Sequence, residues 1–327
     1  MQEAVGEVAC IGEALALVPY PDIDSVEPDA VRLAGAEANV AVGLAAGGVR
    51  ASWLGRLGTD PLGDVLLAAL TAAGVEVGAV QRDPERPTGR YAKRTGVDGS
   101  GEPATTMVYR RAGSAASAMD PEFRRAPAVA QRLAAARIVH LSGITAALSP
   151  ACAALMDALV TDPRSGLLAF DVNWREQMWP DGDPAVVAAL AGHADVVLVG
   201  ADEAGRVFGT DDPAQLRALL QGPRLLVVKD GSRQALAIDR AGAVVARPAL
   251  AVEVVEPVGA GDAFAAGLLT GLVRGEDIGR CLRRGHLGAA AVLTVPGDTA
   301  PPLDPALLDL DDAGWAALRV SADAVLT

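Results

Sequence analysis

The residues best suited to chemistry lie in the segment VEPVGAGDAFAAG, residues 255–267. The valine-rich run 252–255 predicts the end of a strand, and residues 263–273 have the small, apolar composition of a buried helix. We therefore expect Gly259, Ala260 and Gly261 at a helix N-terminus, where free backbone N–H groups and the helix dipole favour an anion. Asp262 then suits a base that takes a proton while these amides hold a transferring phosphoryl group. Taken alone, Asp262 could equally cap the helix.

A second polar turn comes much earlier, in LAGAEANVAVGLAAG, residues 33–47. It places Gly35 and Asn39 at the head of an alanine-rich helix, where they could contact substrate oxygens. Asn39 could equally cap the helix or pack locally.

A larger fold must position both turns, and the chain from about Ala126 onward predicts one. The apolar runs RIVHLSGI, LLAFDVN, DVVLVGA and RLLVVKDG are typical of buried parallel strands. Helices are expected near residues 128–136, 150–161 and 213–221. This alternation predicts a doubly wound α/β sheet. Ligands of such sheets bind beyond the carboxyl ends of the strands, where DVN, VGADE, KDG and VGAGD fall.

Residues 87–115 interrupt the alternation. TGRYAKRTG and ATTMVYRRAG have strand-like patterns and are separated by the glycine-rich VDGSGEP, which predicts a hairpin too small for its own core. We interpret it as a lid over a binding cleft; the alternative is an edge extension of the main sheet. Without repeats or long linkers, residues 1–327 are expected to form a single domain.

Composition narrows the function classes. The 327 residues include 28 Lys and Arg and 41 Asp and Glu, so the net charge is −13, which argues against nucleic-acid or anionic-membrane partners. Cys10, Cys152 and Cys281 are scattered and are expected to be reduced. The N-terminus lacks a basic region typical of a signal peptide, and breaks interrupt every apolar stretch, so a cytoplasmic protein without membrane spans is expected.

Together, GAEANVAVGLA and PVGAGDAFAAG resemble the motifs of the ribokinase-like, or PfkB, carbohydrate kinases, and the similarity extends from Gly6 to about Pro302. With YRRAGSAAS, HLSGITAALSP and DVNWREQMW following in order, the chain is most similar to 2-keto-3-deoxygluconate kinases. The resemblance implies a ribokinase-like, mostly parallel sheet with a small β lid from segments near residues 12–33 and 87–115. It also implies ATP-dependent phosphorylation of the terminal hydroxyl of a keto-deoxy sugar acid, giving the 6-phosphate, with Mg²⁺.

The resemblance also implies substrate contacts. The matching positions are Gly35, Ala36, Glu37 and Asn39 in the first turn, Tyr91, Tyr109 and Arg110 in the lid, and Arg175 after a strand. A guanidinium donates two parallel hydrogen bonds, so Arg175 suits a carboxylate or phosphate clamp. Cross-strand packing of the tyrosines and a surface salt bridge of Arg175 are the alternatives.

The resemblance further implies that Asp262 accepts the proton of the substrate hydroxyl. An ordinary aspartate, with a pKa of about 3.9, suffices if proton transfer is late in a loose transition state. On the nucleotide side, the segment KDGSRQA matches the ATP-binding loop of the family. The implied nucleotide contacts are Lys229, Gly231, Ser232, Ala235 and His286. Glu203 matches the acidic residue that helps to organise Mg²⁺ through water. A plain β-turn, a packed histidine and a solvated glutamate are the alternatives.

The chain departs from the family pattern at Glu256, Gly200, Gln234 and Val108. Glu256 stands where an aspartate or small polar residue is usual and bears on a monovalent-cation site. The departure at Gly200 concerns the organisation of magnesium, that at Gln234 concerns the affinity for the nucleotide, and that at Val108 concerns the identity of the substrate.

Among rival functions, a dinucleotide-binding domain fails at Phe264, where a third glycine is needed, and a P-loop kinase is excluded because no GK[ST] follows a glycine loop. A noncatalytic sugar-acid binding protein, other PfkB-type kinases (ribokinase, fructokinase or nucleoside kinase) and a homo-oligomer through the lid stay open.

Overall fold

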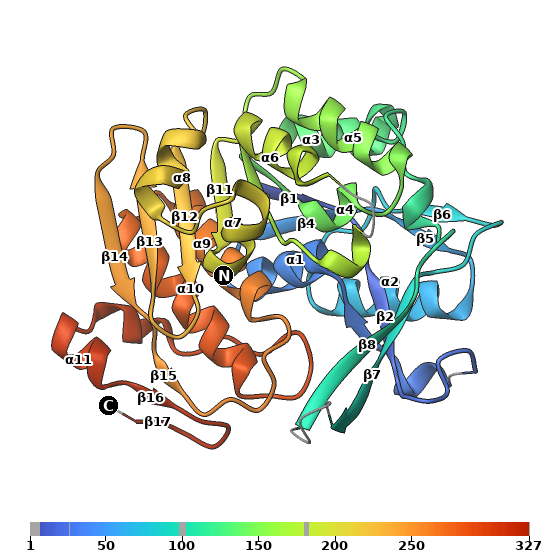
Figure 1. Cartoon of the computed structure of the whole chain (residues 1–327). Helices are drawn as coiled ribbons and strands as arrows, with labels where there is room; N and C mark the ends of the chain where they lie inside the picture. Colours follow the sequence, from blue (N-terminus) through green and yellow to red (C-terminus); the bar gives the residue numbers. More distant parts are fainter. Residues whose placement is uncertain (1–6, 26, 98–102, 180–182, 327) are drawn as a thin grey trace.

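The computed structural model describes residues 7–25, 27–97, 103–179 and 183–326, and an eight-stranded sheet forms its centre (Figure 1). The order of its strands is β14-β13-β12-β11-β10-β9-β1-β4. The parallel strands are β1 (Glu7–Ile11), β4 (Arg50–Leu54), β9 (Ile138–Ser142), β10 (Leu167–Asp171), β11 (Val196–Gly200) and β12 (Leu225–Asp230). At one edge, β13 (Gln234–Asp239) and β14 (Val244–Pro248) continue the sheet in antiparallel fashion. The predicted fold class, a mostly parallel α/β sheet, is confirmed.

Helices cover both faces of this sheet, because its strands carry apolar side chains on both sides that must be buried. In β1, Val8 and Cys10 join the core on one face, and Ala9 and Ile11 join the core on the other, as the period of two requires. The first face carries α1 (Ala36–Ala46), α2 (Pro61–Ala72), α9 (Ala260–Arg274) and α10 (Ile278–Leu293). The second carries α3 (Pro127–Ala135), α5 (Pro150–Thr161), α6 (Pro184–His193), α7 (Ala201–Phe208) and α8 (Pro213–Leu219).

The strands and helices predicted from about Ala126 onward are present, with small shifts of their ends. The four apolar runs form β9 to β12, and the three expected helices are α3, α5 and α8. The strand expected over 252–255 is wrong beyond its first residue, because β15 is only Ala251–Val252. Its partner β16 (Arg319–Val320) is equally short, and the N–H of Val255 bonds instead to the carbonyl of Leu293.

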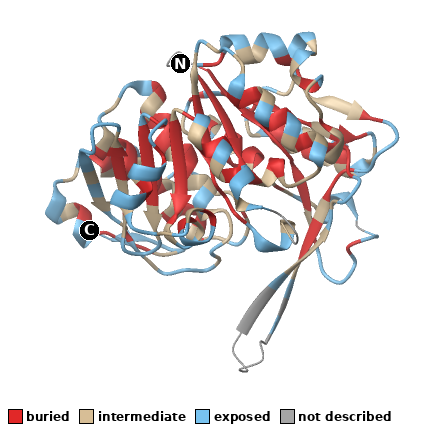
Figure 2. Ribbon diagram, turned by 45° about the horizontal axis from the view of Figure 1, so that its top comes forward, coloured by how far each residue is buried: buried red, intermediate tan, exposed pale blue. Residues whose placement is uncertain are grey.

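The predicted hairpin forms a separate sheet, so the edge-extension alternative is wrong. Its strand order is β3-β2-β7-β8, with bounds Arg32–Ala34, Leu15–Val18, Arg90–Val97 and Pro103–Arg110. We call these four strands the lid sheet. Among the described residues, its own buried cluster consists of Leu15, Ala34 and Tyr91, and Figure 2 shows the hairpin projecting from the body. Most of the VDGSGEP connection, residues 98–102, lies outside the described residues.

The remaining elements are short. They are β5 (Arg56–Gly58), β6 (Gln81–Asp83), β17 (Val325–Leu326), α4 (Gly143–Ala146), α11 (Asp312–Ala317) and the 3₁₀ turns η1 (Pro28–Ala30), η2 (Ala116–Ala118), η3 (Phe123–Arg125), η4 (Glu176–Met178) and η5 (Pro305–Asp309). Cys10, Cys152 and Cys281 are free thiols and are buried. Among the described helices, none has the length and apolar character needed to cross a bilayer.

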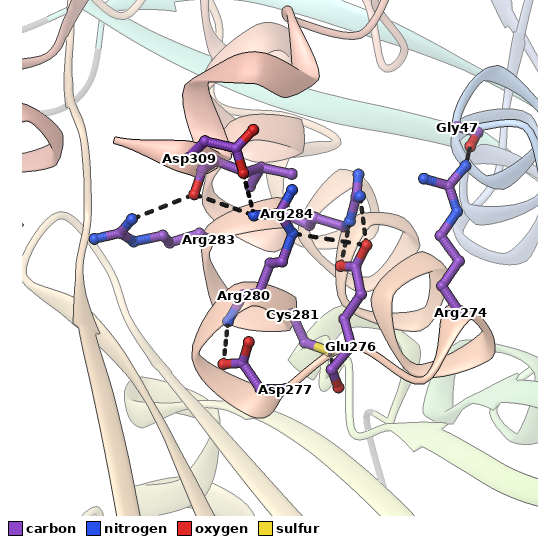
Figure 3. Close-up of polar contacts among 10 residues, drawn as sticks. Gly47, Arg274, Glu276, Asp277, Arg280, Cys281, Arg283, Arg284 and Asp309 are labelled. Carbon is purple, nitrogen blue, oxygen red and sulfur yellow. Dashed lines mark hydrogen bonds and ion pairs between the residues drawn. The ribbon is translucent and has the colours of Figure 1, made fainter. Parts of the chain in front are cut away.

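Arginine contacts hold α9 and α10 to their surroundings (Figure 3). Arg284 of α10 donates to both carboxylate oxygens of Glu276, each at 2.5 Å, and Arg280 donates to Asp309 at 2.6 Å. At the end of α9, Arg274 donates to the carbonyl of Gly47 at 2.6 Å. These arginine hydrogen bonds stabilise the position of α9, the helix that begins at the turn of residues 259–261.

Candidate functional site

Asp262 lies in the first turn of α9 and points to a residue from the other end of the chain. The helix begins at Ala260, three residues earlier than predicted, with Gly259 before it in the left-handed conformation at a φ of 85°. A Cβ atom there would lie 2.5 Å from the carbonyl oxygen of Asp298, so the turn requires glycine. Asn39 at the head of α1 donates its Nδ2 to Asp262 Oδ2 at 2.8 Å. The structure thus brings the two predicted polar turns together.

The side-chain contacts of Asp262 argue against a capping role. Its second carboxylate oxygen lies 3.5 Å from Nδ2 of Asn173, which has a strained φ of 39° just beyond β10. In the described part of the chain, both of its hydrogen-bond donors are therefore asparagine side chains rather than backbone N–H groups of α9.

The surroundings of Asp262 change its acidity. Burial raises the pKa of Asp262 to about 7, and the negative charge of Asp171 adds to the increase. The hydrogen bond from Asn39 and the positive charges of Arg175 and Lys229 oppose it. The ordinary pKa expected from the sequence is therefore wrong, because burial penalises the charged carboxylate more than its partners stabilise it. A carboxylate with such a pKa is a good general base at neutral pH.

Lys229 supplies positive charge beside the same turn. It lies near the end of β12, and its Nζ is 2.9 Å from Oδ2 of Asp171 at the end of β10. Burial disfavours the ammonium, but Asp171, Glu203 and Asp262 together raise the pKa of Lys229 above its usual value. A Cβ atom on Gly261 would lie 3.7 Å from this ammonium. Because its pKa is raised, Lys229 stays charged next to the amides at the start of α9.

The other predicted nucleotide contacts lie on the β12–β13 hairpin and on α10. Gly231, with a φ of 51°, and Ser232 form the exposed turn of the hairpin, whereas Ala235 is buried in β13. His286 is buried: its Nε2 lies 3.1 Å from the carbonyl of Arg247, and its ring meets the edge of Phe264. Burial lowers the pKa of His286 to about 4. Packing accounts for this histidine, and its nucleotide role stays a prediction.

The turn before α1 is held mainly by structural contacts. Gly35 has a φ of 114°, and a Cβ atom there would lie 2.4 Å from the carbonyl oxygen of Glu13. Glu37 is fully buried, and its Oε1 accepts hydrogen bonds from Ser142 and Thr145, both at 2.7 Å. Glu37 therefore ties α1 to the end of β9. Contacts of Gly35, Ala36 and Glu37 with a substrate stay predictions.

The two lid tyrosines form a stacked pair. Tyr91 and Tyr109 face each other across β7 and β8, with ring centroids 5.5 Å apart. The hydroxyl of Tyr91 donates to Oδ2 of Asp298 at 2.8 Å, so the lid sheet contacts the body of the protein. Cross-strand packing is thus observed, and a substrate contact stays a prediction.

The structure places Arg111, rather than the predicted Arg110, on the inner side of the lid sheet. The Arg110 side chain is 51% exposed and lies 3.7 Å from Asp24. The Arg111 side chain is 12% exposed, pairs with buried Glu13, and stacks its guanidinium 5.2 Å from the Tyr109 ring centre. Since side chains of an extended chain alternate, an inward Tyr109 predicts an inward Arg111. This signal was available in the sequence.

Arg175 and Glu203, which have separate predicted roles, are partners in the structure. Arg175 donates to Oε1 of Glu203 at 3.0 Å, and the N–H of Gly200 donates to Oε2 at 2.9 Å. The Arg175 side chain is about half exposed, so the surface salt bridge is observed and the clamp stays a prediction. In the described ranges, no group of three or more His, Cys, Asp or Glu could hold a metal ion.

Several residues of the site carried no predicted role. They are Asn173, Asp171, Arg111, Lys93 and Asp298. Asp171 and Asn173 belong to the DVN stretch that directly follows a buried strand, which was a usable signal. Lys93 and Asp298 meet only through the fold.

The chain is similar to known carbohydrate kinases. It matches the pfkB family carbohydrate kinases over residues 5–305. It is 30% identical over 302 residues to a 2-dehydro-3-deoxygluconokinase of Bacillus subtilis (strain 168), covering 89% of this chain and 91% of the relative. It is 31% identical over 304 residues to a 2-dehydro-3-deoxygalactonokinase of Haloferax volcanii, covering 90% and 93%. A sugar kinase of Pyrococcus horikoshii, solved in complex with ATP, superposes with a TM-score of 0.77 at 25% identity, covering 94% and 99%.

Proposed function

Because the chain belongs to the pfkB family of carbohydrate kinases and is therefore an ATP-dependent sugar kinase, we propose that its acceptor is a keto-deoxy sugar acid. The proposed substrate is 2-keto-3-deoxygluconate, and the product is its 6-phosphate. Similarity to kinases named for two such acids supports the substrate class.

The observation that carries the proposed chemistry is the contact of Asp262 with Asn39 at the start of α9. Asp262 accepts the proton of the terminal hydroxyl while the hydroxyl oxygen forms a bond to the γ-phosphorus of ATP. The bond from that phosphorus to the bridging oxygen breaks, and ADP leaves with the electron pair. The pKa of about 7 supports this role, because a sizeable fraction of the carboxylate is then ionised at neutral pH.

The phosphoryl group is proposed to lie against the N-terminus of α9. The backbone N–H groups of Gly259, Ala260 and Gly261 have no partners within the first turn of the helix and can donate to phosphate oxygens. Lys229 adds a positive charge beside them. Mg²⁺, when bound, would supply positive charge to the phosphate oxygens, and Glu203 would help to hold it through a water molecule. Both Glu203 oxygens are already oriented by protein donors.

For the carboxylate of the acid, Arg111 is the better-placed cation of the lid sheet. Its Nε is buried without a hydrogen-bond partner among the described residues, and the stacked Tyr109 orients the guanidinium plane. Its pairing with Glu13 leaves further donors, since a guanidinium has five N–H groups. Arg175, which follows the end of β10 by four residues, can add a second contact.

A coupled ADP-release assay tests the substrate class with 2-keto-3-deoxygluconate, 2-keto-3-deoxygalactonate, fructose, ribose and a nucleoside. A charge-assisted hydrogen bond contributes about 1.5–3 kcal/mol, so kcat/KM should be roughly tenfold to a hundredfold higher for the acids. Equal or better turnover of fructose or ribose would exclude the sugar-acid assignment.

Two variants locate the acid contact. Arg111→Lys keeps the charge opposite Glu13 but loses the planar fork, so it should reduce the preference for acids while neutral sugars react as before. Arg110→Lys is the matched control, because its exposed side chain lies outside the stacked pair. An equal effect of both variants would argue against Arg111 as the acid-binding residue.

A further inference from the structure

Lys93 reaches from the lid sheet to two carboxylates of the body. It lies in β7, two residues after Tyr91, so both side chains point to the same side of the strand. Its Nζ is 3.0 Å from Oδ1 of Asp298 and also contacts Oε1 of Glu256. The exposed fractions of Lys93, Glu256 and Asp298 are 15%, 19% and 5%, so the three charges lie largely out of water.

Both carboxylates are attached to the turn that begins α9. Glu256 precedes that turn by three residues, and its Oε2 accepts from the N–H of Gly297 at 3.0 Å. The backbone of Asp298 lies against Gly259, since a Cβ atom added to Gly259 would lie 2.5 Å from the carbonyl oxygen of Asp298. Two carboxylates held this close repel each other unless a cation lies between them. The ammonium of Lys93 is that cation in this structure.

We infer that Lys93 is a positioning residue whose ammonium takes the place of a monovalent metal ion between Glu256 and Asp298. By neutralising the two carboxylates it holds the Gly259–Gly261 turn in the form that receives the phosphoryl group. Because the ammonium belongs to the lid sheet, docking of the lid and completion of the turn are coupled. The free-cation site suggested by the resemblance at Glu256 does not fit these residues, since a lysine already lies there.

The inference predicts an enzyme that does not need K⁺. At constant ionic strength, wild-type kcat should be the same in potassium chloride and in tetramethylammonium chloride, whose cation is too large to replace K⁺. Lys93→Ala leaves two partly buried carboxylates without a cation, so its kcat should fall at least about tenfold in tetramethylammonium chloride. K⁺ should restore most of that loss by binding in the vacated position. A side chain that only packs the lid would not be replaced by K⁺.

Two further variants separate charge from structure. Lys93→Arg keeps a cation and should remain independent of K⁺. Arg94→Ala removes the same charge from the next residue of β7, which is exposed, and should behave as the wild type. The inference rests on the kinase activity of the family and not on the identity of the sugar, so these assays use whichever acceptor is turned over.

Thermal unfolding provides a test without any acceptor. The Tm of Lys93→Ala should be higher in potassium chloride than in tetramethylammonium chloride, whereas the wild type should have the same Tm in both salts. Activation of the wild type by K⁺ would overturn the inference. A Lys93→Ala variant with wild-type kcat, or one that K⁺ neither stabilises nor activates, would also overturn it. A sugar acid that fails as a substrate changes only the proposed function and leaves this test intact.

Discussion

At the scale of single residues, the surroundings of Asp262 make an ordinary carboxylate into a base suited to neutral pH. Burial raises its pKa to about 7, while the donor Asn39 limits the increase by stabilising the charged form. The cost is a charge kept partly out of water. Active sites commonly retain such unfavourable groups because the chemistry uses them.

The first residue-scale prediction concerns Asp262→Asn. The amide keeps the shape of the side chain but cannot take the hydroxyl proton, so kcat should fall by at least about a hundredfold. ATP affinity should change little, because the Gly259–Gly261 amides and Lys229 remain. Steady-state kinetics and nucleotide titration of a variant shown to be folded by circular dichroism provide the measurement. A variant that retains more than about a tenth of wild-type kcat would contradict the catalytic role.

The second prediction is the pH dependence of the wild-type rate. Since the base must be deprotonated and its pKa is about 7, kcat/KM should decrease as the pH falls below that value. In Asn39→Ala the hydrogen bond that lowers this pKa is lost, so the acidic limb should move to higher pH. Profiles of both proteins with saturating ATP measure the shift. A limb that stays in place or moves to lower pH in Asn39→Ala would refute this coupling.

At the scale of elements, the lid sheet has the smallest of the buried clusters that the described residues form. Among its described residues, three side chains form its own buried cluster, and its contacts with the body include those of Tyr91 with Asp298 and of Lys93 with Glu256. The β7–β8 hairpin of this sheet cannot bury enough apolar surface to be stable alone. The lid sheet should therefore open more readily than the main sheet.

Hydrogen exchange followed by mass spectrometry measures this opening. We predict that amides of β7 and β8 exchange faster than those of β9 and β10 in the free enzyme, and that they slow when sugar and nucleotide bind together. Peptides from β9 and β10 are the internal control, since these central strands are buried. Exchange in β7 that is unchanged in the ternary complex would indicate a static sheet rather than a lid.

At the scale of the whole molecule, both apolar cores share one sheet. Alternate residues of the same strands, such as Val8 and Ala9 in β1, belong to opposite faces. Losing one core exposes the strands that hold the other, so the two cannot melt independently. We predict one calorimetric transition for the free enzyme, with equal calorimetric and van't Hoff enthalpies. Two resolved transitions would argue against a single domain over residues 1–327.

Several strands and helices and the family could be predicted from the sequence alone. Strands β9 to β12 follow from short apolar runs, and α5 lies at the expected residues 150–161, because these signals depend on neighbours along the chain. The turn around Gly259 and the polar head of α1 were readable for the same reason, since each motif is contiguous. The end of the strand at Val252 could not be predicted, because its short partner β16 comes from residues far along the chain.

The interactions between these residues depend on the three-dimensional fold. The pKa of Asp262 depends on burial and on Asn39, which is 223 residues away. Lys93 meets Asp298 across 205 residues, and Arg175 meets Glu203 across 28. Burial and Coulomb interactions depend on distance in space, and no local pattern in the sequence encodes that distance. Motifs can therefore identify the groups of a site, while the fold sets their charges and partners.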